Sequence, residues 1–238
     1  MSKVAIITGA GKGVGRALAK ALYEDGYRLG LVTRAEADLA SLVEELGASS
    51  ERVIWRAGDA ADEQLARELV DAVLAAFGQI DVLVNNAGMG KYGLLEELTV
   101  ANYDEMMNSN MRSTFVYTYY AVPHMKQRGQ GNIVNIASVA GVKGLPQESV
   151  YCATKFAQVG FGQALDQELR PFGIKVTNIC PGGIRTHFAI GTGRTERDPR
   201  LGEFLDADDV VKAVRFVLEQ SPKSRIMELL MRPMSEAH

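Results

Sequence analysis

The sequence of 238 residues has only two cysteines, no cluster of basic residues and no long apolar run. Cys152 and Cys180 have neither the spacing of metal ligands nor a CxxC neighbour, which argues against a zinc site and against a disulfide framework. We take both cysteines as reduced. No histidine accompanies Cys152 in the local sequence, so a nucleophilic thiol is the weaker interpretation of that residue.

Charge and hydrophobicity argue against two classes of partner. The net charge is -3 and no basic stripe is present to neutralise phosphates, so we expect no nucleic-acid partner. The first apolar run, residues 4–7, is too short for a signal peptide or a membrane span. We therefore expect no membrane partner and a cytoplasmic protein. Nothing resembles a linker or a repeat, which predicts one domain over residues 1–238.

Short apolar runs alternate with longer segments of helical period. Between the runs, segments such as residues 65–77 repeat apolar residues at spacings of three and four. This alternation predicts an α/β fold, a doubly wound parallel sheet with helices on both faces and ligands at the carboxyl ends of the strands. Residues 187–205 are rich in Gly, Arg, Thr and Asp and are expected to form a substrate-binding loop or lid. The predicted strands are residues 4–7, 29–32, 53–55, 80–84, 133–136, 174–179 and 226–231.

Glycines follow the first predicted strand, in a turn that runs from Thr8 to Gly15, and a helix is expected by Arg16. Such glycines let the backbone approach a pyrophosphate, whose charge is favoured at a helix start. The spacing is Gly-x-x-x-Gly-x-Gly rather than the general Rossmann pattern, and alone it also fits a purely structural turn.

Three later strand ends carry further polar turns. Asp59, followed by Ala60, could accept a hydrogen bond from an adenine amino group, and the other two turns are Asn85-Asn86-Ala87-Gly88 and Pro181-Gly182 with Ile184 and Thr186. Each could be turn chemistry alone. Four such turns on one edge of one sheet predict a dinucleotide site.

The segment "YCATK", residues 151–155, places a phenol and an ammonium on one helical face, because the apolar residues that follow it recur at mostly three and four. An ammonium about 4 Å from a phenol favours the phenolate by about 4 kcal/mol, or nearly three pKa units. That would bring Tyr151 into the range of acid/base catalysis. Taken alone the pair would be a surface contact, but Ser138 precedes it and a Pro-Gly turn follows.

These motifs occur in the order found in one family. The sequence resembles the classical short-chain dehydrogenases/reductases over nearly its whole length, through the Thr-Gly-x-x-x-Gly-x-Gly turn, the Asn-Asn-Ala-Gly turn and Tyr-x-x-x-Lys. The resemblance implies a Rossmann-type seven-stranded sheet, a nicotinamide dinucleotide and interconversion of a carbonyl and an alcohol. The expected cofactor contacts are Gly9, Lys12, Gly13, Val14, Arg34, Asp59, Ala60, Asn86, Ala87, Gly88, Tyr151, Lys155, Pro181, Gly182, Ile184 and Thr186.

The expected catalytic residues are Asn110, Ser138, Tyr151 and Lys155. Tyr151 would donate a proton to the carbonyl oxygen as NADPH delivers hydride, and Ser138 would hydrogen-bond the same oxygen. Lys155 would lower the tyrosine pKa and bind the nicotinamide ribose. By resemblance, Asn110 would hold a water that relays protons to Lys155.

Kinship also implies a homodimer or homotetramer, formed through the helix that bears Tyr151 and the helix that contains an aromatic cluster. We interpret that cluster as packing rather than cofactor contact; it consists of Phe115, Tyr117, Tyr119 and Tyr120.

The second predicted strand ends in Thr33-Arg34, where an NAD site usually has an acid. Lys12 can reach the same ribose, and charge-assisted hydrogen bonds of about 1.5 to 3 kcal/mol each would favour NADP(H) about a hundredfold or more. Glu36 is the nearest acid and is expected one turn inside the next helix. The alternative is that both cations are solvated surface charges.

The substrate pocket is expected to be apolar, which suits a small or medium carbonyl. Its predicted walls are Met89, Tyr92, Val139, Val142, Leu145, Gln147 and Phe188. The arginines at 185, 194, 197 and 200 could attract an acidic substrate, although solvated loop charges are the favoured interpretation.

The segment "IMELLMRPMSEAH" lacks the Asp-Gly-Gly of ketoacyl-carrier-protein reductases. Together with "GMGKYGLLEELT" and "TRAEADL" it resembles bacterial sepiapterin-reductase-like members, which implies a sepiapterin-like diketone. The alternatives are a 3-oxoacyl-[acyl-carrier-protein] reductase-like enzyme, an epimerase or dehydratase of the extended relatives, and a non-catalytic NADP-sensing regulator.

Overall fold

Seven strands pair in parallel in the order β3-β2-β1-β4-β5-β6-β7 within residues 2–195 and 198–236, which the computed structural model describes. The predicted seven-stranded sheet is confirmed. Each predicted run overlaps one strand, and the runs at 80–84 and 226–231 begin two residues before theirs. The strands are β1 (Val4–Thr8), β2 (Arg28–Thr33), β3 (Val53–Ala57), β4 (Val82–Asn85), β5 (Gly131–Ile136), β6 (Ile174–Pro181) and β7 (Glu228–Met231).

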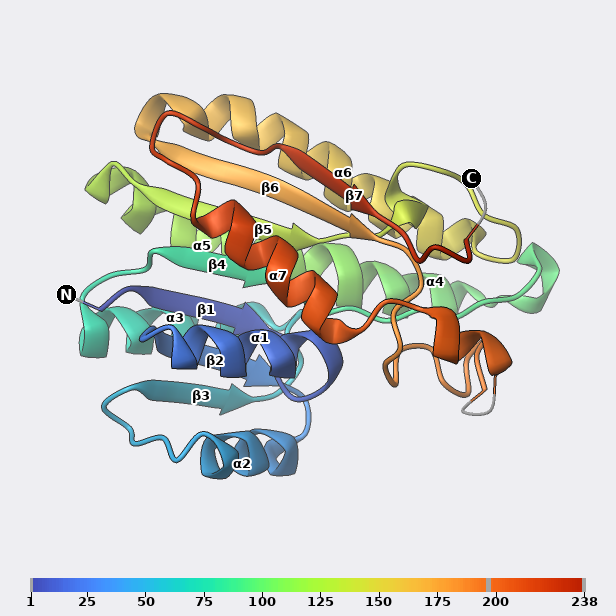
Figure 1. The fold of residues 1–238 in the computed structure, drawn as a ribbon, viewed down its shortest axis with the longest axis horizontal. Coiled ribbons are helices and arrows are strands. Elements are labelled where there is room, and N and C mark those ends of the chain that lie inside the picture. Colours follow the sequence, from blue (N-terminus) through green and yellow to red (C-terminus); the bar gives the residue numbers. More distant parts are fainter. Residues whose placement is uncertain (1, 196–197, 237–238) are drawn as a thin grey trace.

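Helices cover both faces of this sheet (Figure 1). One face packs against α1 (Gly13–Glu24), α2 (Glu36–Glu45) and α7 (Ala207–Leu218). The other packs against α3 (Glu63–Phe77), α5 (Ser113–Arg128) and α6 (Ser149–Leu169), and α4 (Val100–Met107) precedes α5. Because the sheet is covered twice, successive residues of one strand enter different cores: Ala5 and Ile7 enter the first, Val4 and Ile6 the second.

The strand order reverses beside β1, which pairs with β2 on one side and β4 on the other. In an open parallel sheet the crevice at such a switch point, beyond the carboxyl ends of the strands, is the usual ligand site. The loops after β1 and β4 are the glycine turn and the Asn-Asn-Ala-Gly turn. The fold therefore brings these two motifs together.

A ladder of buried asparagines crosses the sheet at this end. Asn85, Asn135 and Asn178 are register partners on β4, β5 and β6. Asn85 Nδ2 donates to Asn135 Oδ1 at 2.9 Å, and Asn135 Nδ2 donates to Asn178 Oδ1 at 3.0 Å. Asn178 Nδ2 then donates to the carbonyl of Val159 at 3.1 Å, which fixes α6 against the sheet.

Residues 187–205 include a short 3-10 helix, Pro199–Glu203, and parallel bridges from Ile184 to Leu205 and from Ile190 to Arg194. Arg197, one of the arginines considered for an acidic substrate, lies outside the described residues, as does the side chain of Arg200. None of the described helices is long and apolar enough to cross a bilayer.

Candidate active site

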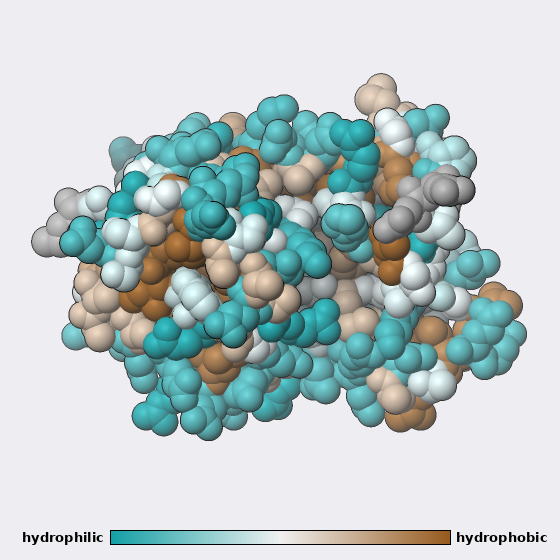
Figure 2. Space-filling view, turned by 90° about the horizontal axis from the view of Figure 1, so that it is seen from below, coloured by the Kyte–Doolittle hydropathy of each residue, from teal (hydrophilic) through white to brown (hydrophobic). Residues whose placement is uncertain are grey.

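A cavity of about 640 Å³ opens at the carboxyl ends of the strands, and every predicted cofactor contact lies on its wall. In Figure 2 the surface is hollowed between the larger and the smaller part of the molecule, with hydrophilic residues around the hollow. The cavity extends from the glycine turn after β1 to Tyr151 at the start of α6. One cavity therefore contains both the predicted cofactor contacts and the predicted catalytic tyrosine.

The glycine turn is shaped for close backbone approach. Gly9 has φ +67°, and a Cβ on it would lie 2.9 Å from Ala87 Cα. A Cβ on Gly15 would lie 2.1 Å from the Gly9 carbonyl oxygen. No side chain fits at either position, so the backbone of this turn can approach an anionic group at the start of α1 closely.

The turn after β4 is tied to this loop. Thr8 Oγ1 accepts from the amides of Asn86 and Ala87 at 3.0 and 2.9 Å, and Asn86 Nδ2 donates to the carbonyls of Thr8 and Gly9 at 2.9 and 3.1 Å. Two turns that are distant in sequence are thus hydrogen-bonded into one rigid surface at the bottom of the cavity. An extended dinucleotide fits such a surface, because the ligand can lie close to the backbone along its length where bulky side chains are few.

The end of β2 carries the charges that would select between phosphorylated and unphosphorylated ribose. Arg34 is exposed and lines the cavity, and Lys12 Nζ lies 3.5 Å from a carboxylate oxygen of Asp38. The expectation of two cations without an opposing acid was wrong, because Asp38 lies on the cavity wall. Glu36 is also placed differently, since it is the first residue of α2 and not one turn inside it.

Two further strand ends complete the cofactor wall. Asp59 follows β3, lines the cavity and accepts from the Ala61 amide at 2.9 Å. After β6, Thr186 Oγ1 accepts from the Phe188 amide at 3.3 Å, and a Cβ on Gly13 would lie 3.2 Å from the Thr186 methyl group. The segment after β6 therefore closes over the glycine turn.

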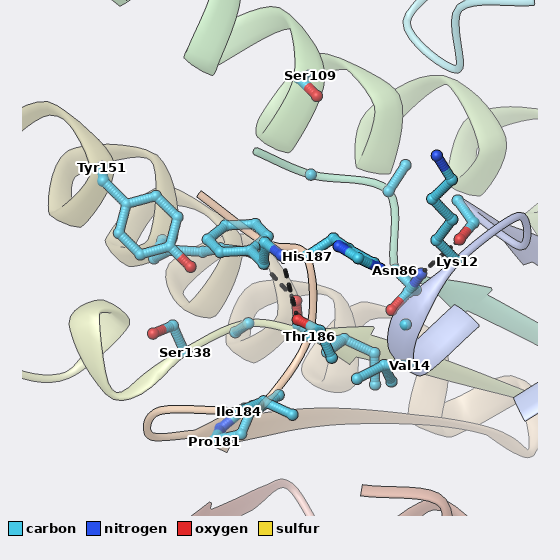
Figure 3. Close-up of a pocket in the computed structure, with 18 of the residues that line it drawn as sticks. Lys12, Val14, Asn86, Ser109, Ser138, Tyr151, Pro181, Ile184, Thr186 and His187 are labelled. Atoms are coloured by element: carbon cyan, nitrogen blue, oxygen red, sulfur yellow. Dashed lines mark hydrogen bonds between the residues drawn. The ribbon is translucent and has the colours of Figure 1, made fainter. Parts of the chain in front are cut away.

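Tyr151 and Ser138 share one wall at the other end of the cavity, and Figure 3 shows both hydroxyls facing the same space. Ser138 Oγ accepts from the Ala140 amide at 3.1 Å, which leaves its own proton free to donate. Tyr151 is 6% exposed, and burial raises its pKa well above 10.0, while the neighbouring Ser138 hydroxyl favours the ionised form. The phenol is therefore protonated at neutral pH.

Lys155 also lies on this wall, close to the Tyr151 ring. Its Nζ is 5.7 Å from the centroid of the Tyr151 ring and donates to Ile136 O at 3.1 Å and to Gln158 Oε1 at 2.7 Å. Burial lowers the lysine pKa to about 7. The lowering of the tyrosine pKa by Lys155 stays a prediction.

Asn110 is fully buried at the junction of α4 and α5, in a π-helical turn (Asn108–Arg112), and is not on the cavity wall. Its side chain accepts from the Met89 amide at 2.7 Å and donates to Met89 O at 2.9 Å and Thr154 Oγ1 at 2.8 Å. Together, these contacts link Met89, in the loop after β4, to Thr154, the residue before Lys155. The amide thus braces the catalytic wall.

Comparison with known proteins agrees with this geometry. The family model described as short chain dehydrogenase matches residues 3–197. The chain belongs to the short-chain dehydrogenase family, and it is an oxidoreductase.

Three similar proteins cover almost the whole chain. An uncharacterized oxidoreductase of Staphylococcus aureus is 31% identical over 231 residues, 97% of each chain. The alcohol dehydrogenase of Thermococcus sibiricus, solved with 5-hydroxy-NADP, has 29% identity and a TM-score of 0.88 over 100% of this chain and 99% of its own. The 3-ketoacyl-(acyl-carrier-protein) reductase of Brucella melitensis, solved with NADH, has 30% identity and a TM-score of 0.88 over 98% and 97%.

The substrate end of this short-chain dehydrogenase differs from the apolar pocket expected. Tyr92, Val139, Leu145 and Phe188 line the cavity, whereas Met89, Val142 and Gln147 do not. Tyr92 packs edge-on against Tyr151 at 5.6 Å between ring centroids, and Phe188 lies 5.8 Å from it. The expectation of few polar groups was wrong, because His187, Glu148 and Arg194 are also on the wall.

The other expected residues near this end lie elsewhere. Arg185 is exposed and ion-paired with Asp206 at 2.6 Å. In the aromatic cluster on α5, Tyr117 is fully buried, while Phe115 and Tyr119 are 47% and 59% exposed. None of these three aromatic side chains lines the cavity.

The last described residues of the dehydrogenase return to the cleft. Glu236 lines the cavity, accepts from the Gly183 amide at 2.7 Å and lies 3.6 Å from Arg232. This contact joins the C-terminal segment to the turn after β6.

Sequence reasoning missed four side chains of this site: Asp38, Glu148, Gln158 and Glu236. Gln158 had a usable signal, since a glutamine on the helical face of Lys155 is a polar residue in an otherwise apolar row. Glu148 could have been found from its place one turn before Tyr151. Asp38 and Glu236 gave no local signal, because only the folded chain brings them to the cleft.

Proposed function

We propose that this protein is an NADP(H)-dependent oxidoreductase that interconverts a carbonyl and a secondary alcohol, with Tyr151 as general acid and base. The observation that carries the proposal is the placement of Tyr151, Ser138 and Lys155 on one wall of a cavity whose other end is a bare glycine turn flanked by Lys12 and Arg34. The NADP-bound relative supports the phosphorylated cofactor.

Bound nicotinamide dinucleotide supplies the hydride that adds to the carbonyl carbon. The chain supplies the rest. Ser138 donates a hydrogen bond to the carbonyl oxygen and positions it, and Tyr151 transfers its proton to that oxygen. Because burial keeps the phenol protonated, this arrangement favours proton donation at neutral pH.

Lys155 would bind the nicotinamide ribose, and Gln158 and Ile136 hold its Nζ in place. Asn110 would keep the wall rigid through Thr154. The relay of protons through a water held by Asn110 stays a prediction.

We further propose that the chain forms a homodimer or homotetramer through α5 and α6, whose aromatic side chains are partly exposed. The cytoplasmic location, the single domain and the sepiapterin-like subgroup stay predictions from the sequence. The ketoacyl-carrier-protein reductase is a second candidate activity, supported by the similar Brucella melitensis structure.

Replacing Tyr151 by Phe tests the proposal. Loss of the hydroxyl that transfers its proton to the oxygen should reduce turnover about 10² to 10⁴-fold, with NADPH affinity nearly unchanged. NADPH oxidation with diketones, quinones, pterins and ketoacyl thioesters measures turnover. Fluorescence titration with NADPH measures the cofactor affinity. Tyr119→Phe, outside the cavity, is the control. Near-normal turnover in Tyr151→Phe would remove Tyr151 from the mechanism.

NADPH binding without turnover of any compound in the panel would instead support the alternative of a non-catalytic NADP-sensing regulator. Strong turnover of the ketoacyl thioesters alone would select the carrier-protein reductase.

A further inference from the structure

Glu148 is an acidic residue at the substrate end whose carboxylate makes no hydrogen bond and no ion pair with the described residues. It is the N-cap residue of α6, one turn before Tyr151, and it is half-buried on the cavity wall. Its backbone is fully used, since its amide donates to Leu145 O at 3.3 Å and its carbonyl accepts from the Cys152 amide at 2.7 Å. The backbone therefore fixes the residue while the carboxylate is left for a ligand.

The environment of this carboxylate is unfavourable for an isolated charge. Burial raises the pKa of Glu148, Arg194 opposes that shift, and Glu236 adds to it. A half-buried carboxylate without a hydrogen-bond partner loses hydration, and the attraction of Arg194 opposes the effect of burial without cancelling it. A cation delivered by a ligand would replace the lost hydration.

Arg194 supplies the opposite charge on the same wall. Its guanidinium carbon lies 6.0 Å from the centroid of the Tyr92 ring and 5.1 Å from that of Phe204. Its Nη1 donates to Ile184 O at 3.4 Å, and within the described ranges no carboxylate comes within ion-pair distance of it. The guanidinium therefore lies near two aromatic rings and forms no ion pair with the described residues.

Hydrogen bonds hold the segment that carries Arg194 over the reacting phenol. The Tyr92 amide donates to Thr192 O at 2.8 Å, and Thr192 Oγ1 donates to Gly90 O at 2.7 Å. Burial is the main cause of the raised pKa of Tyr151; Glu148 adds to this shift, and Arg194 opposes it. Arg232 and Glu236, which also line the cavity, interact with each other and leave these two groups available.

We infer that the substrate is a small hydroxy or keto amino acid, whose ammonium binds Glu148 and whose carboxylate binds Arg194 while its hydroxyl or carbonyl faces Tyr151 and Ser138. This inference rests on the proposed function. In the oxidative direction Tyr151 first gives its own proton to solvent; the C–H bond of the alcohol carbon then breaks with its electron pair, which reduces NADP⁺ to NADPH, and the hydroxyl proton passes to the Tyr151 phenolate. The alcohol is oxidised to the ketone, and Tyr151 is left protonated, as at the start.

Four secondary alcohols that differ only in these charges test the inference. Threonine carries both groups, 3-hydroxybutyrate only the carboxylate, 1-aminopropan-2-ol only the ammonium and butan-2-ol neither. NADP⁺ reduction followed at 340 nm gives kcat/KM for each. Threonine should exceed either singly charged compound about tenfold or more, since each contact is a hydrogen bond to a charged group.

Variants that remove one charge each should change different ratios of kcat/KM. Glu148→Gln should lower the ratio of kcat/KM for threonine to that for 3-hydroxybutyrate about tenfold, because only threonine carries the ammonium. Arg194→Gln should lower the ratio of threonine to 1-aminopropan-2-ol by a similar factor, because only threonine carries the carboxylate. Arg185→Gln, an exposed arginine paired with Asp206, should leave both ratios unchanged.

If Glu148 and Arg194 interacted only with each other and not with the substrate, neither ratio of kcat/KM would change, because either variant would then affect all four compounds alike. That result, or equal kcat/KM for threonine and butan-2-ol, would overturn the inference while leaving the dehydrogenase function intact. Turnover of neutral carbonyls but of none of the four alcohols would also overturn it. Failure of every carbonyl and alcohol would overturn the proposed function itself, and this inference with it.

Discussion

Gln158 is the residue on which the state of Lys155 depends most directly. Its Oε1 accepts from Lys155 Nζ at 2.7 Å, its Nε2 donates to Thr114 Oγ1 at 2.7 Å, and all three side chains are buried. An acceptor stabilises the ammonium, while burial lowers the lysine pKa to about 7. These two effects oppose each other close to physiological pH.

Gln158→Leu should move the titration midpoint of Lys155 to lower pH, and Gln158→Glu should move it to higher pH. The loss of a hydrogen bond to a charged group, about 1.5 to 3 kcal/mol, corresponds to about one pH unit or more. The ¹³Cε shift of Lys155, identified by its absence in Lys155→Met, reports the midpoint. If both variants moved the midpoint in the same direction, a general loosening of the core would be the better explanation.

The pair of Lys12 and Asp38 sets how strongly the phosphorylated cofactor is preferred. Asp38 lies close to the position where Lys12 and Arg34 would meet a ribose phosphate, and its charge would repel that phosphate. Asp38→Asn should raise the ratio of kcat/KM for NADPH to that for NADH about two- to fivefold, the scale of an exposed ion pair.

Lys12→Ala should lower the same ratio, and Glu36→Gln, an exposed acid outside the cavity wall, serves as the matched control. A decrease of the ratio in Asp38→Asn would show that Asp38 helps to position Lys12 rather than opposing the phosphate.

At the scale of single residues, the motifs predicted the cofactor wall well, because backbone turns determine which residues face a crevice. The electrostatic interactions between side chains were predicted poorly. Asp38 and Glu148 act through space on Lys12 and Tyr151, and distances between helix and loop are not encoded in local spacing. The tyrosine pKa shows the same limit, because the sequence indicates that Lys155 is near but not that burial dominates.

Helix α6 lies very close to β6 because it has a glycine where they meet. A Cβ on Gly162 would lie 2.2 Å from Asn178 Oδ1, the last member of the asparagine ladder. Gly162→Ala should therefore lower the free energy of unfolding by about 1 to 3 kcal/mol, as overpacking does, measured by urea denaturation.

Gly144→Ala is the matched control, since nothing lies within 4 Å of a Cβ there, and it should change stability by less than about 0.5 kcal/mol. Equal stabilities of the two variants would mean that α6 can shift away from β6 at no cost.

Element boundaries were predictable where one physical signal dominates. The helix predicted over residues 65–77 begins earlier, at Glu63, because the Asp62 side chain accepts from the Leu65 amide and caps the helix. The run at residues 80–84 starts two residues before β4, and the side chain of Asp81, just before the strand, accepts from the Val4 amide at 2.7 Å. The asparagine ladder was not predictable, since it depends on the register of three strands.

The whole molecule exposes aromatic side chains on α5 and α6, on surface that the catalytic cleft does not use. Phe115 stacks on Tyr119 at 5.8 Å and approaches Phe161 at 6.3 Å, and Phe156 is 46% exposed. If these helices join subunits as proposed, Phe115→Glu should convert the oligomer to monomer by burying an unpaired charge. Sedimentation equilibrium measures the mass.

Val100→Glu adds the same charge at a residue that is 78% exposed, and it should leave the mass unchanged. An unaltered assembly in Phe115→Glu, or a monomeric parent protein, would place any interface elsewhere.

The return of Glu236 to the cleft has a practical consequence. Because Glu236 accepts from the Gly183 amide and lines the cavity, a change that displaces the segment around Glu236 would disturb the turn after β6. The amino end of β1 lies at the opposite end of that strand from the glycine turn, so a tag placed before β1 is the better choice. Kinetic constants for this enzyme are therefore best measured on amino-terminally tagged or tag-free protein.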